Sequence, residues 1–248
     1  MIVFVTGASA GFGTAMVRRF VREGHRVVAA ARRLGRVNEL RDELGDSVLP
    51  LLLDVRDRQA VEAAFAALPA EFAEVDVLVN NAGLALGLEP AQRASLDDWD
   101  TMVDTNVKGL MYCTHAALPG MVTRARGHII NIGSVAGEWP YPGGNTYGAS
   151  KAFVRQFTLN LRADLIGTGV RATDIEPGLC GGTEFSVTRF KGDQVRADAI
   201  YENTMPLSAD DIADTVYWVA SRPAHININV LQLMPQCQAF GPIAVKRG

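Results

Sequence analysis

The chain has 248 residues, 48% hydrophobic and 21% charged, which is enough apolar material for one large folded domain and excludes a disordered or fibrous class. Its formal net charge is −3 and its lysines and arginines are scattered, so no general attraction to nucleic acid or acidic membranes is indicated. The three cysteines lie far apart without metal-ligand spacing, which argues against a disulfide framework or a metal site and favours a reducing compartment.

Strands alternate with amphipathic helices along the first part of the chain. Runs rich in β-branched residues predict the strands, and apolar residues at helical spacing between them predict the helices. The predicted strands cover 2–5, 26–31, 48–53 and 75–79, and the predicted helices cover 14–23, 37–44 and 60–68. This alternation predicts right-handed crossovers and a parallel sheet that is covered on both faces.

The second part of the chain continues the pattern with longer helices. A helix is predicted from a capping-box-like start at Ser95 to about residue 124, with Pro119 bending or ending it. Strands at 128–132, 170–175 and 226–233 alternate with helices at 146–166 and from Ser208 onward. No repeat or linker interrupts the chain, so we expect a single domain over 1–248. The expected fold is a doubly wound α/β fold of the Rossmann type, with a parallel sheet of about seven strands.

The stretch VTGASAGFG follows the first predicted strand and enters the first predicted helix. Glycines at Gly7, Gly11 and Gly13 allow a sharp turn and a close approach to a pyrophosphate, whose charge the helix N-terminus favours. The predicted dinucleotide contacts in this loop are Gly7, Ala8, Ser9, Gly11, Phe12 and Gly13. The spacing differs from the usual Gly-x-Gly-x-x-Gly, and a purely structural turn is the alternative.

Two arginines, Arg32 and Arg33, end the second predicted strand, where an acidic residue would hold the free ribose hydroxyl of NAD. Arginine matches a 2′-phosphate instead, so NADP is the predicted cofactor; the alternative is two solvated surface arginines. Asp54 and Val55, after the third strand, are candidates for the adenine edge, although aspartate at a strand end is also a routine turn residue.

Six motifs in order resemble those of the short-chain dehydrogenase/reductases. They are Thr6-Gly7-x3-Gly11-x-Gly13, Asn80-Asn81-Ala82-Gly83, Asn106-Val107-Lys108-Gly109, Gly133-Ser134, Tyr147-x3-Lys151 and Pro177-Gly178. Within that family, the stretches 177–185 and 223–228 resemble the NADP-dependent serine and 3-hydroxy acid dehydrogenases. The resemblance implies an enzyme that acts on CH-OH groups with a nicotinamide cofactor.

The predicted catalytic residues are Ser134, Tyr147, Lys151 and Asn106. Tyr147 and Lys151 are four residues apart on a predicted helix, and an ammonium near a phenol lowers the phenol's pKa, which makes it usable as an acid or base. Ser134 follows a strand at the carboxyl edge of the sheet and can orient the substrate oxygen. The resemblance implies that the Asn106 side chain holds a relay water, whereas an ordinary polar helix position is the alternative.

The resemblance also implies the remaining cofactor contacts. Asn81, rather than Asn80, is expected on the adenosine side together with Ala82 and Gly83. Tyr147 and Lys151 are expected against the cofactor as well. The segment from Pro177 and Gly178 to Phe185 is expected to cover the nicotinamide, with Thr183 available to its carboxamide.

The predicted substrate is a small 3-hydroxy acid of the serine, allo-threonine, 3-hydroxyisobutyrate or 3-hydroxypropionate type, held by Ser134, Tyr147 and Arg189. Arg189 and Lys191 lie in a variable segment, 183–205, that is expected to form a lid. Arg196 is a further cation there, and all three can equally be solvated charges. The alternatives are a broad carbonyl or alcohol reductase and, in another class, a nucleotide-sensing binding protein.

Neither a nucleic-acid partner nor a membrane partner is expected. No apolar run approaches a membrane span and the N-terminus lacks signal-peptide features, so the expected compartment is the cytoplasm. The tail from residue 235 is expected either to cross onto a neighbouring subunit of a homo-oligomer, a tetramer or dimer, or to be disordered.

Overall fold

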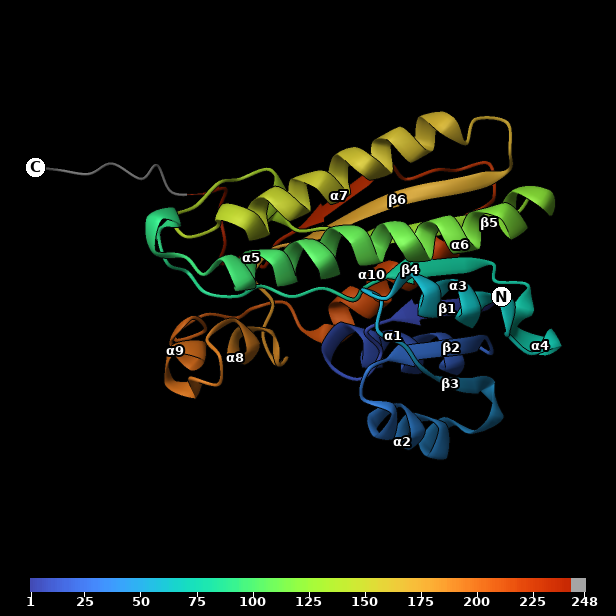
Figure 1. Ribbon diagram of the computed structural model, residues 1–248, viewed down its shortest axis with the longest axis horizontal. Helices are drawn as coiled ribbons and strands as arrows, with labels where there is room; N and C mark the ends of the chain where they lie inside the picture. Colours follow the sequence, from blue (N-terminus) through green and yellow to red (C-terminus); the bar gives the residue numbers. More distant parts are fainter. Residues whose placement is uncertain (242–248) are drawn as a thin grey trace, which may run out of the picture.

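A seven-stranded parallel sheet forms the centre of the molecule (Figure 1). The computed structural model describes residues 1–241. The strand order is β3-β2-β1-β4-β5-β6-β7, and every neighbouring pair is parallel. The strands are β1 (Ile2–Thr6), β2 (Arg26–Ala31), β3 (Val48–Leu52), β4 (Val77–Asn80), β5 (Gly127–Ile132), β6 (Val170–Pro177) and β7 (Val230–Leu233). The predicted doubly wound α/β fold is confirmed.

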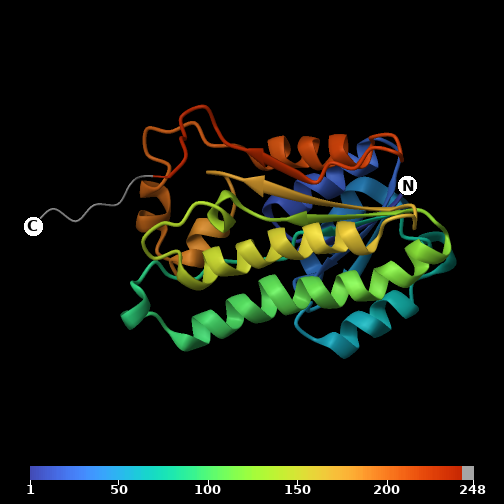
Figure 2. The same cartoon turned by 90° about the horizontal axis from the view of Figure 1, so that it is seen from above.

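Helices cover both faces of the sheet, as the view from above shows (Figure 2). One face packs against α1 (Gly11–Arg22), α2 (Leu34–Leu44) and α10 (Ala209–Ala220). The other packs against α3 (Arg58–Ala66), α6 (Leu110–Thr123) and α7 (Asn145–Asp164). The shorter helices are α4 (Ala70–Ala73), α5 (Leu96–Val103), α8 (Phe185–Arg189) and α9 (Gln194–Ala199). Among residues 1–241, no helix is long and apolar enough to cross a bilayer.

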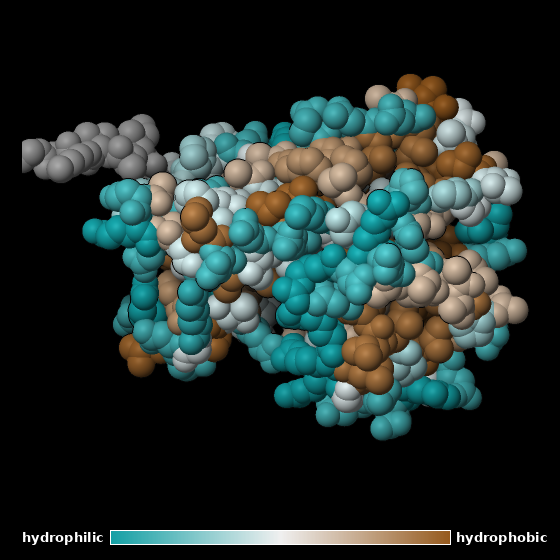
Figure 3. All heavy atoms as spheres, viewed as in Figure 1, coloured by the Kyte–Doolittle hydropathy of each residue, from teal (hydrophilic) through white to brown (hydrophobic). Residues whose placement is uncertain are grey.

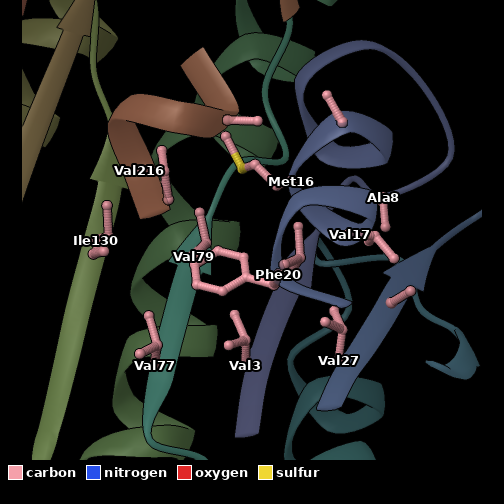
Figure 4. Packing of buried hydrophobic residues seen from close by; sticks show 14 of the residues in the cluster. Val3, Ala8, Met16, Val17, Phe20, Val27, Val77, Val79, Ile130 and Val216 are labelled. Carbon is pink, nitrogen blue, oxygen red and sulfur yellow. The ribbon is translucent and has the colours of Figure 1, made fainter. Parts of the chain in front are cut away.

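The strands are apolar on both sides because both faces of the sheet are covered. In β1, Val3 and Val5 belong to the core cluster under α1, whereas Phe4 belongs to the cluster on the opposite face. Phe20 of α1 is fully buried over the sheet, beside Val3 and Val79 (Figure 4). Burial of one such side chain contributes about 1.5–3 kcal/mol, and the alternation therefore fixes which side of each strand faces which helix layer.

The sheet is built outward in two directions from β1. The chain first adds β2 and β3 on one side and then returns to place β4 on the other side of β1. Ligands of doubly wound sheets bind at such a reversal, outside the carboxyl ends of the strands. The glycine loop follows β1, and Asn81, Ala82 and Gly83 follow β4, so both segments border this crevice.

Two element boundaries differ from those predicted. The last strand begins at Val230, not at residue 226, because the Asn227 side chain pairs with the backbone of Ala172 in place of a strand residue. The predicted helix from Ser95 continues through Pro119 to Thr123, but its middle part, Asp104–Gly109, is π-helical. A proline removes one helical hydrogen bond, and α6 tolerates that loss.

The segment 183–205 holds two short helices, α8 and α9, at one end of the molecule (Figure 1). The tail residues 235–241 return to the same chain: the Leu179 amide donates to Oε1 of Gln238 at 2.6 Å, and the Phe240 ring lies 5.0 Å from that of Trp139. These residues pack on their own chain, and the crossing of the tail onto another subunit stays a prediction. Residues 242–248 lie outside the described chain.

Candidate active site

The glycine loop between β1 and α1 has the geometry of an anion-binding turn. Gly7 and Gly11 have positive φ values of 67° and 51°, a region that L side chains rarely adopt. A Cβ at Gly13 would lie 2.8 Å from Cα of Ala8, so only glycine lets α1 start this close to the strand. The first amides of α1 therefore lie at the crevice, where their unpaired N–H groups suit a pyrophosphate.

Asn81 ties the loop after β4 to the glycine loop. Its Nδ2 donates to the carbonyl oxygen of Thr6 at 2.8 Å, while its own amide and that of Ala82 donate to Oγ1 of Thr6 at 3.0 and 2.9 Å. A Cβ on Gly7 would come within 2.9 Å of the Ala82 Cα. Thr6 thus joins two predicted cofactor segments, a role that the sequence reasoning missed although Thr6 directly precedes the motif glycine.

Arg33 connects the glycine loop to the segment 183–205. Its Nε donates to Oγ of Ser9 at 3.2 Å, and its Nη2 lies 2.7 Å from Oε2 of Glu184. This guanidinium lowers the pKa of the Glu184 carboxyl. Arg32 beside it is exposed. Two guanidinium groups after β2 and the Ser9 hydroxyl of the glycine loop fit the 2′-phosphate of NADP. Glu184 is a contact that the sequence did not predict.

A hollow of about 670 Å³ lies between α1, α2 and the segment 183–205. Figure 3 shows the molecule hollowed between these parts. Ser9 and Gly11 line it on one side, and Thr183 and Glu184 line it on the other. It borders the phosphate end of the predicted cofactor site and does not include Tyr147 or Lys151.

Asp54 and Val55 lie beyond the end of β3. The Asp54 carboxylate is held by Arg56, with Nη2 2.6 Å from Oδ2, and this hydrogen bond lowers the pKa of Asp54. Val55 is buried, and a Cβ at Gly109 would lie only 2.6 Å from its Cγ2. The Asp54 carboxylate is therefore hydrogen-bonded to Arg56, and an adenine group would compete with this guanidinium for it.

Ser134 and Tyr147 meet at the carboxyl end of the sheet. Ser134 Oγ accepts from the Ala136 amide at 3.1 Å and lies 3.4 Å from the Pro177 carbonyl oxygen. Its hydroxyl also hydrogen-bonds the Tyr147 side chain in the sense that favours the phenolate. The structure therefore brings together the two residues predicted to hold the substrate oxygen.

Lys151 lies one turn after Tyr147 on α7, with both side chains buried. Its Nζ donates to the carbonyl oxygen of Ile132 at 2.7 Å and lies 5.8 Å from the centre of the Tyr147 ring. Burial lowers the pKa of Lys151 to about 8.

The pKa of Tyr147 differs from the expectation that Lys151 lowers it. Burial raises it to about 12, and the influences that oppose burial are the Ser134 hydrogen bond and the charge of Arg189. The reason is geometric: the Lys151 ammonium is turned toward the Ile132 carbonyl group rather than toward the phenol oxygen.

Asn106 lies in the π-helical segment between α5 and α6, a feature often found at functional sites. Its Nδ2 donates to the Leu84 carbonyl oxygen at 2.8 Å and to Oγ of Ser150 at 3.0 Å, while Oδ1 accepts from the Leu84 amide at 2.9 Å. A Cβ at Gly83 would lie 3.3 Å from Oδ1 and 3.5 Å from Lys151 Nζ. The Asn106 side chain thus fixes the loop after β4 beside Lys151. One lone pair of its Oδ1 remains available to accept a hydrogen bond from the predicted relay water.

Arg189, the last residue of α8, reaches the same site from the segment 183–205. Its Nη2 donates to the Tyr141 hydroxyl at 2.5 Å and its Nε donates to the Gly87 carbonyl oxygen at 3.2 Å. Its Cζ lies 5.4 Å from the centres of the Tyr141 and Tyr147 rings. Phe185 packs edge-on against Tyr147, with the ring centres 5.8 Å apart. Tyr141 and Phe185 belong to no sequence motif, so these aromatic contacts could not be predicted.

The other two cations of the segment lie away from Tyr147. Lys191 forms an ion pair with Asp98 at 2.8 Å, and Arg196 stacks on Phe190 at 4.6 Å from the ring centre. Thr183 contacts the position of Gly11, and its Oγ1 accepts from the Phe185 amide at 3.3 Å. Of the three predicted carboxylate partners, the structure brings only Arg189 to the candidate catalytic residues.

Pro177 ends β6 and Gly178 follows it, next to Ser134, whose Oγ lies 3.4 Å from the Pro177 carbonyl oxygen. The Gly178 amide donates to the Leu233 carbonyl oxygen at 2.8 Å. A Cβ at Gly178 would clash with Gln238, whose side chain holds the next residue, Leu179. The tail thus fixes the start of the segment predicted to cover the nicotinamide, a role of Gln238 that no motif signalled.

Comparison with known proteins agrees with this geometry. Residues 1–194 match the family model for short chain dehydrogenase, so the chain belongs to the short-chain dehydrogenase family. It is 63% identical over 247 residues to the NADP-dependent 3-hydroxy acid dehydrogenase of Salmonella typhi, with all of both chains covered. It is 51% identical over 245 residues to the serine 3-dehydrogenase of Agrobacterium fabrum, covering 99% of this chain and 98% of that one.

Solved structures include a near-superimposable relative. The closed form of serine dehydrogenase complexed with NADP+ has a TM-score of 0.99 and 60% identity, with 100% of both chains covered. The fold and family predicted from the sequence motifs are therefore confirmed, whereas the roles of individual residues rest on the geometry above.

Proposed function

We propose that this chain is an NADP-dependent dehydrogenase of small 3-hydroxy acids. The observation that carries the proposal is the position of the Arg189 guanidinium, 5.4 Å from the ring centre of Tyr147 and part of a site that also holds Ser134 and Lys151. Relatives at 63% and 51% identity are a 3-hydroxy acid dehydrogenase and a serine 3-dehydrogenase. A cation beside the proton-exchanging phenol suits a substrate whose carboxylate lies close to the reacting carbon.

NADP, when bound, accepts or supplies the hydride at its nicotinamide ring, which is the chemistry that the cofactor brings. The cofactor would lie along the crevice at the end of the sheet. The groups that would hold it there are the glycine loop, Asn81, Ala82, Gly83, Tyr147, Lys151 and the segment from Pro177 to Thr183. Arg32 and Arg33 would hold its 2′-phosphate, with Ser9 beside them. The positive φ values of Gly7 and Gly11 and the close approach at Gly13 fit this assignment.

Tyr147 exchanges the proton of the substrate hydroxyl. Ser134 positions the hydroxyl oxygen and favours the phenolate form of Tyr147 through its hydrogen bond. The charge of the Arg189 guanidinium favours the phenolate as the proton leaves, and the Lys151 ammonium, 5.8 Å from the ring centre, adds positive charge at longer range. Asn106 acts on the reaction by fixing the Leu84 backbone and Ser150 beside Lys151.

Arg189 binds the substrate carboxylate. Its guanidinium is a planar fork, and its Nε and Nη2 can replace their hydrogen bonds to Gly87 and Tyr141 with two bonds to a carboxylate. Since Arg189 ends α8, substrate binding also ties the segment 183–205 to the site. We propose that this segment acts as a lid that excludes water when substrate is bound.

The remaining predictions concern the whole molecule. We propose that the chain, a single catalytic domain, forms a homo-oligomer, a tetramer or dimer, and acts in the cytoplasm. Its net charge of −3 and dispersed basic residues agree with a small-molecule substrate as its partner.

The test is reduction of NADP+ by purified protein in the presence of serine, allo-threonine or 3-hydroxyisobutyrate, compared with their methyl esters and with a neutral secondary alcohol. Turnover that prefers the free acids supports the proposal. Turnover of the neutral compounds alone would instead establish a broad carbonyl or alcohol reductase. Binding of NADPH without turnover of any compound would point to a nucleotide sensor.

A further inference from the structure

Two buried carboxyl groups lie on β6 near Lys151 and Arg155, and no step above uses them. Asp174 and Glu176 lie two residues apart on β6, hence on the same face of the sheet, and both are fully buried. Their side chains face α7, where Arg155 follows Lys151 by one helical turn. Two acids spaced by two on a strand thus face two cations spaced by four on a helix.

Glu176 is committed to Arg155. Oε1 of Glu176 lies 2.8 Å from Nη1 of Arg155, and Oε2 accepts from Nε2 of Gln232 at 3.1 Å. Arg155 also lies 2.9 Å from Oε2 of Glu138 at the more exposed end of the cluster. These contacts satisfy Glu176 as a carboxylate, so its negative charge is balanced within the cluster.

Asp174 has no such partner. Neither carboxyl oxygen accepts a hydrogen bond from a donor within residues 1–241. Its neighbour is the Glu176 carboxyl, and burial together with this neighbour raises the pKa of Asp174 well above its usual range. Since Arg155 and Gln232 hold the Glu176 carboxyl group while Asp174 lacks a donor, Asp174 is the group that carries a proton at neutral pH.

Gly133 makes room for this carboxyl group. A Cβ at Gly133 would lie 3.0 Å from Cγ of Asp174, too close for any other residue. Gly133 lies between Ser134 and Ile132, whose carbonyl oxygen binds Nζ of Lys151. Asp174 therefore abuts the same stretch of backbone that holds the catalytic serine and the catalytic lysine.

We propose that Asp174 is a positioning residue whose ionisation keeps Lys151 in its ammonium form as the pH rises. At neutral pH Asp174 is protonated and adds no charge beside Lys151. At alkaline pH it loses its proton, and two carboxylates then balance two cations, Lys151 and Arg155. The interaction with Asp174 is the one charge effect that raises the pKa of Lys151 against the lowering caused by burial.

None of the other charged or titratable groups that face this cluster can take the role proposed for Asp174. On α7 they are Tyr147 and Arg155, on β6 Glu176, after β5 Glu138, on β7 Gln232, and in the lid segment Arg189. Glu138 and Glu176 are both paired with Arg155. Tyr147 faces Arg189, and Gln232 does not titrate. Asp174 is therefore the acid left for Lys151.

The experiment is the pH dependence of kcat for the Asp174→Asn variant, and it rests on the proposed roles of Tyr147 and Lys151. An asparagine amide still donates to Glu176 but cannot ionise. We expect kcat at pH 7 to stay within about twofold of the parent, while the alkaline limb of kcat moves about one unit to lower pH, since a nearby opposite charge shifts a pKa by roughly 1–3 units. A purely structural role would lower kcat by the same factor at every pH.

The matched control is Asp164→Asn. Asp164 is exposed at the end of the same helix, about 20 Å from Lys151 at 1.5 Å per residue, and its variant also loses one carboxyl group. Its alkaline limb should coincide with that of the parent. NADPH affinity at pH 7, measured by fluorescence titration, shows that each variant is folded. The profiles are taken with whichever substrate is turned over, acid or neutral, so failure of the acid proposal leaves this test intact.

Glu176→Gln gives the opposite sign. It removes the neighbouring charge that holds the proton on Asp174, and its amide donates to the Asp174 carboxylate, so Asp174 ionises at lower pH. The alkaline limb should then move to higher pH. An alkaline limb that is unchanged in Asp174→Asn, or one that moves in the same direction in both variants, would overturn the proposal.

Discussion

The Arg189 guanidinium carbon lies 5.4 Å from the centre of the Tyr147 ring, although the two residues come from different helices, α8 and α7. Tyr141 holds the same guanidinium through its hydroxyl group at 2.5 Å. The hydrogen bonds to Tyr141 and Gly87 therefore hold the cation beside the Tyr147 ring in this structure.

Arg189→Met should separate acids from esters. The methionine keeps an apolar stem but removes the fork, so kcat/KM for a 3-hydroxy acid relative to its methyl ester should fall about 30-fold or more, chiefly through KM, in line with about 2 kcal/mol or more for a lost desolvated charge pair. Steady-state kinetics with both compounds measure the ratio. Arg196→Met, in the same segment but stacked on Phe190, is the control and should keep the parent ratio. An unaltered ratio for Arg189→Met would place the carboxylate contact elsewhere.

Tyr147→Phe should abolish most turnover while leaving the cofactor bound. The ring keeps its packing against Phe185, but the proton-exchanging hydroxyl is lost, so kcat should fall by about 10²–10⁴. NADPH titration and turnover on one preparation measure both effects. Tyr141→Phe, the same chemical change at the neighbouring ring, should retain activity within about tenfold because Arg189 keeps its bond to Gly87. Near-parent rates in Tyr147→Phe would refute the catalytic assignment.

Replacing Arg32 and Arg33 together by alanine should change cofactor preference. The 2′-phosphate loses two cationic partners, and at about 1.5–3 kcal/mol for each charged hydrogen bond the Kd for NADPH should rise by about 100-fold or more, with that for NADH rising only a few-fold. Fluorescence titration of both cofactors measures the difference. Arg41→Ala, an exposed arginine paired with Asp46, controls for the loss of positive charge. Equal losses for both cofactors would remove the 2′-phosphate assignment.

Lys151→Met should inactivate the enzyme yet stabilise the fold at neutral pH. Burial lowers the pKa of Lys151 to about 8 in the folded chain from 10.5, so the unfolded chain binds the proton more tightly. The parent is penalised below pH 8, and the penalty disappears as the pH rises through 10.5. The variant should therefore be more stable by about 1–3 kcal/mol at pH 7, with the difference closing by about pH 10.5.

Urea unfolding at a series of pH values measures this difference. Lys108→Met is the control, because Lys108 is half-exposed in an ion pair with Asp104 and the loss of an exposed pair should change stability little. A constant stability difference between Lys151→Met and the parent from pH 7 to 10.5 would contradict the assigned pKa.

Phe20→Ala should destabilise the fold by about 3–5 kcal/mol through the cavity that it leaves over the sheet (Figure 4). The change in the urea midpoint, with an unchanged slope, measures the loss. Phe240→Ala is the comparison: the ring is 62% exposed where it packs on Trp139, so its loss should cost much less. A cost below about 1 kcal/mol at Phe20 would contradict its place in the core.

The sequence was sufficient for the layers of the fold and for the residues that carry motifs. Strand periodicity and the order of six motifs predicted the parallel sheet, and Ser134, Tyr147 and Lys151 indeed lie together at its carboxyl edge. Such contacts can be predicted because a parallel sheet brings all strand ends to one side. Boundaries were less exact where a side chain imitates the backbone, as Asn227 does beside β6.

Other features depend on distances between segments far apart in the chain. The bridge from Arg33 to Glu184, the hold of Gln238 on Leu179 and the contact of Asp174 with Glu176 have no local pattern that would reveal them. The pKa of Tyr147 was missed for a related reason. Spacing placed a lysine on the same helix face, whereas burial and the direction of the ammonium decide the outcome.

The π-helical segment Asp104–Gly109 constrains the number of residues between α5 and α6. Deleting one residue there would restore an α-helical turn and close the wide turn that presents the Asn106 side chain. Asn106 would then leave Leu84 and Ser150, or Gly109 would leave its seat against Val55. A single insertion or deletion within this turn would therefore loosen both the backbone beside Lys151 and the contact with Val55, which follows β3.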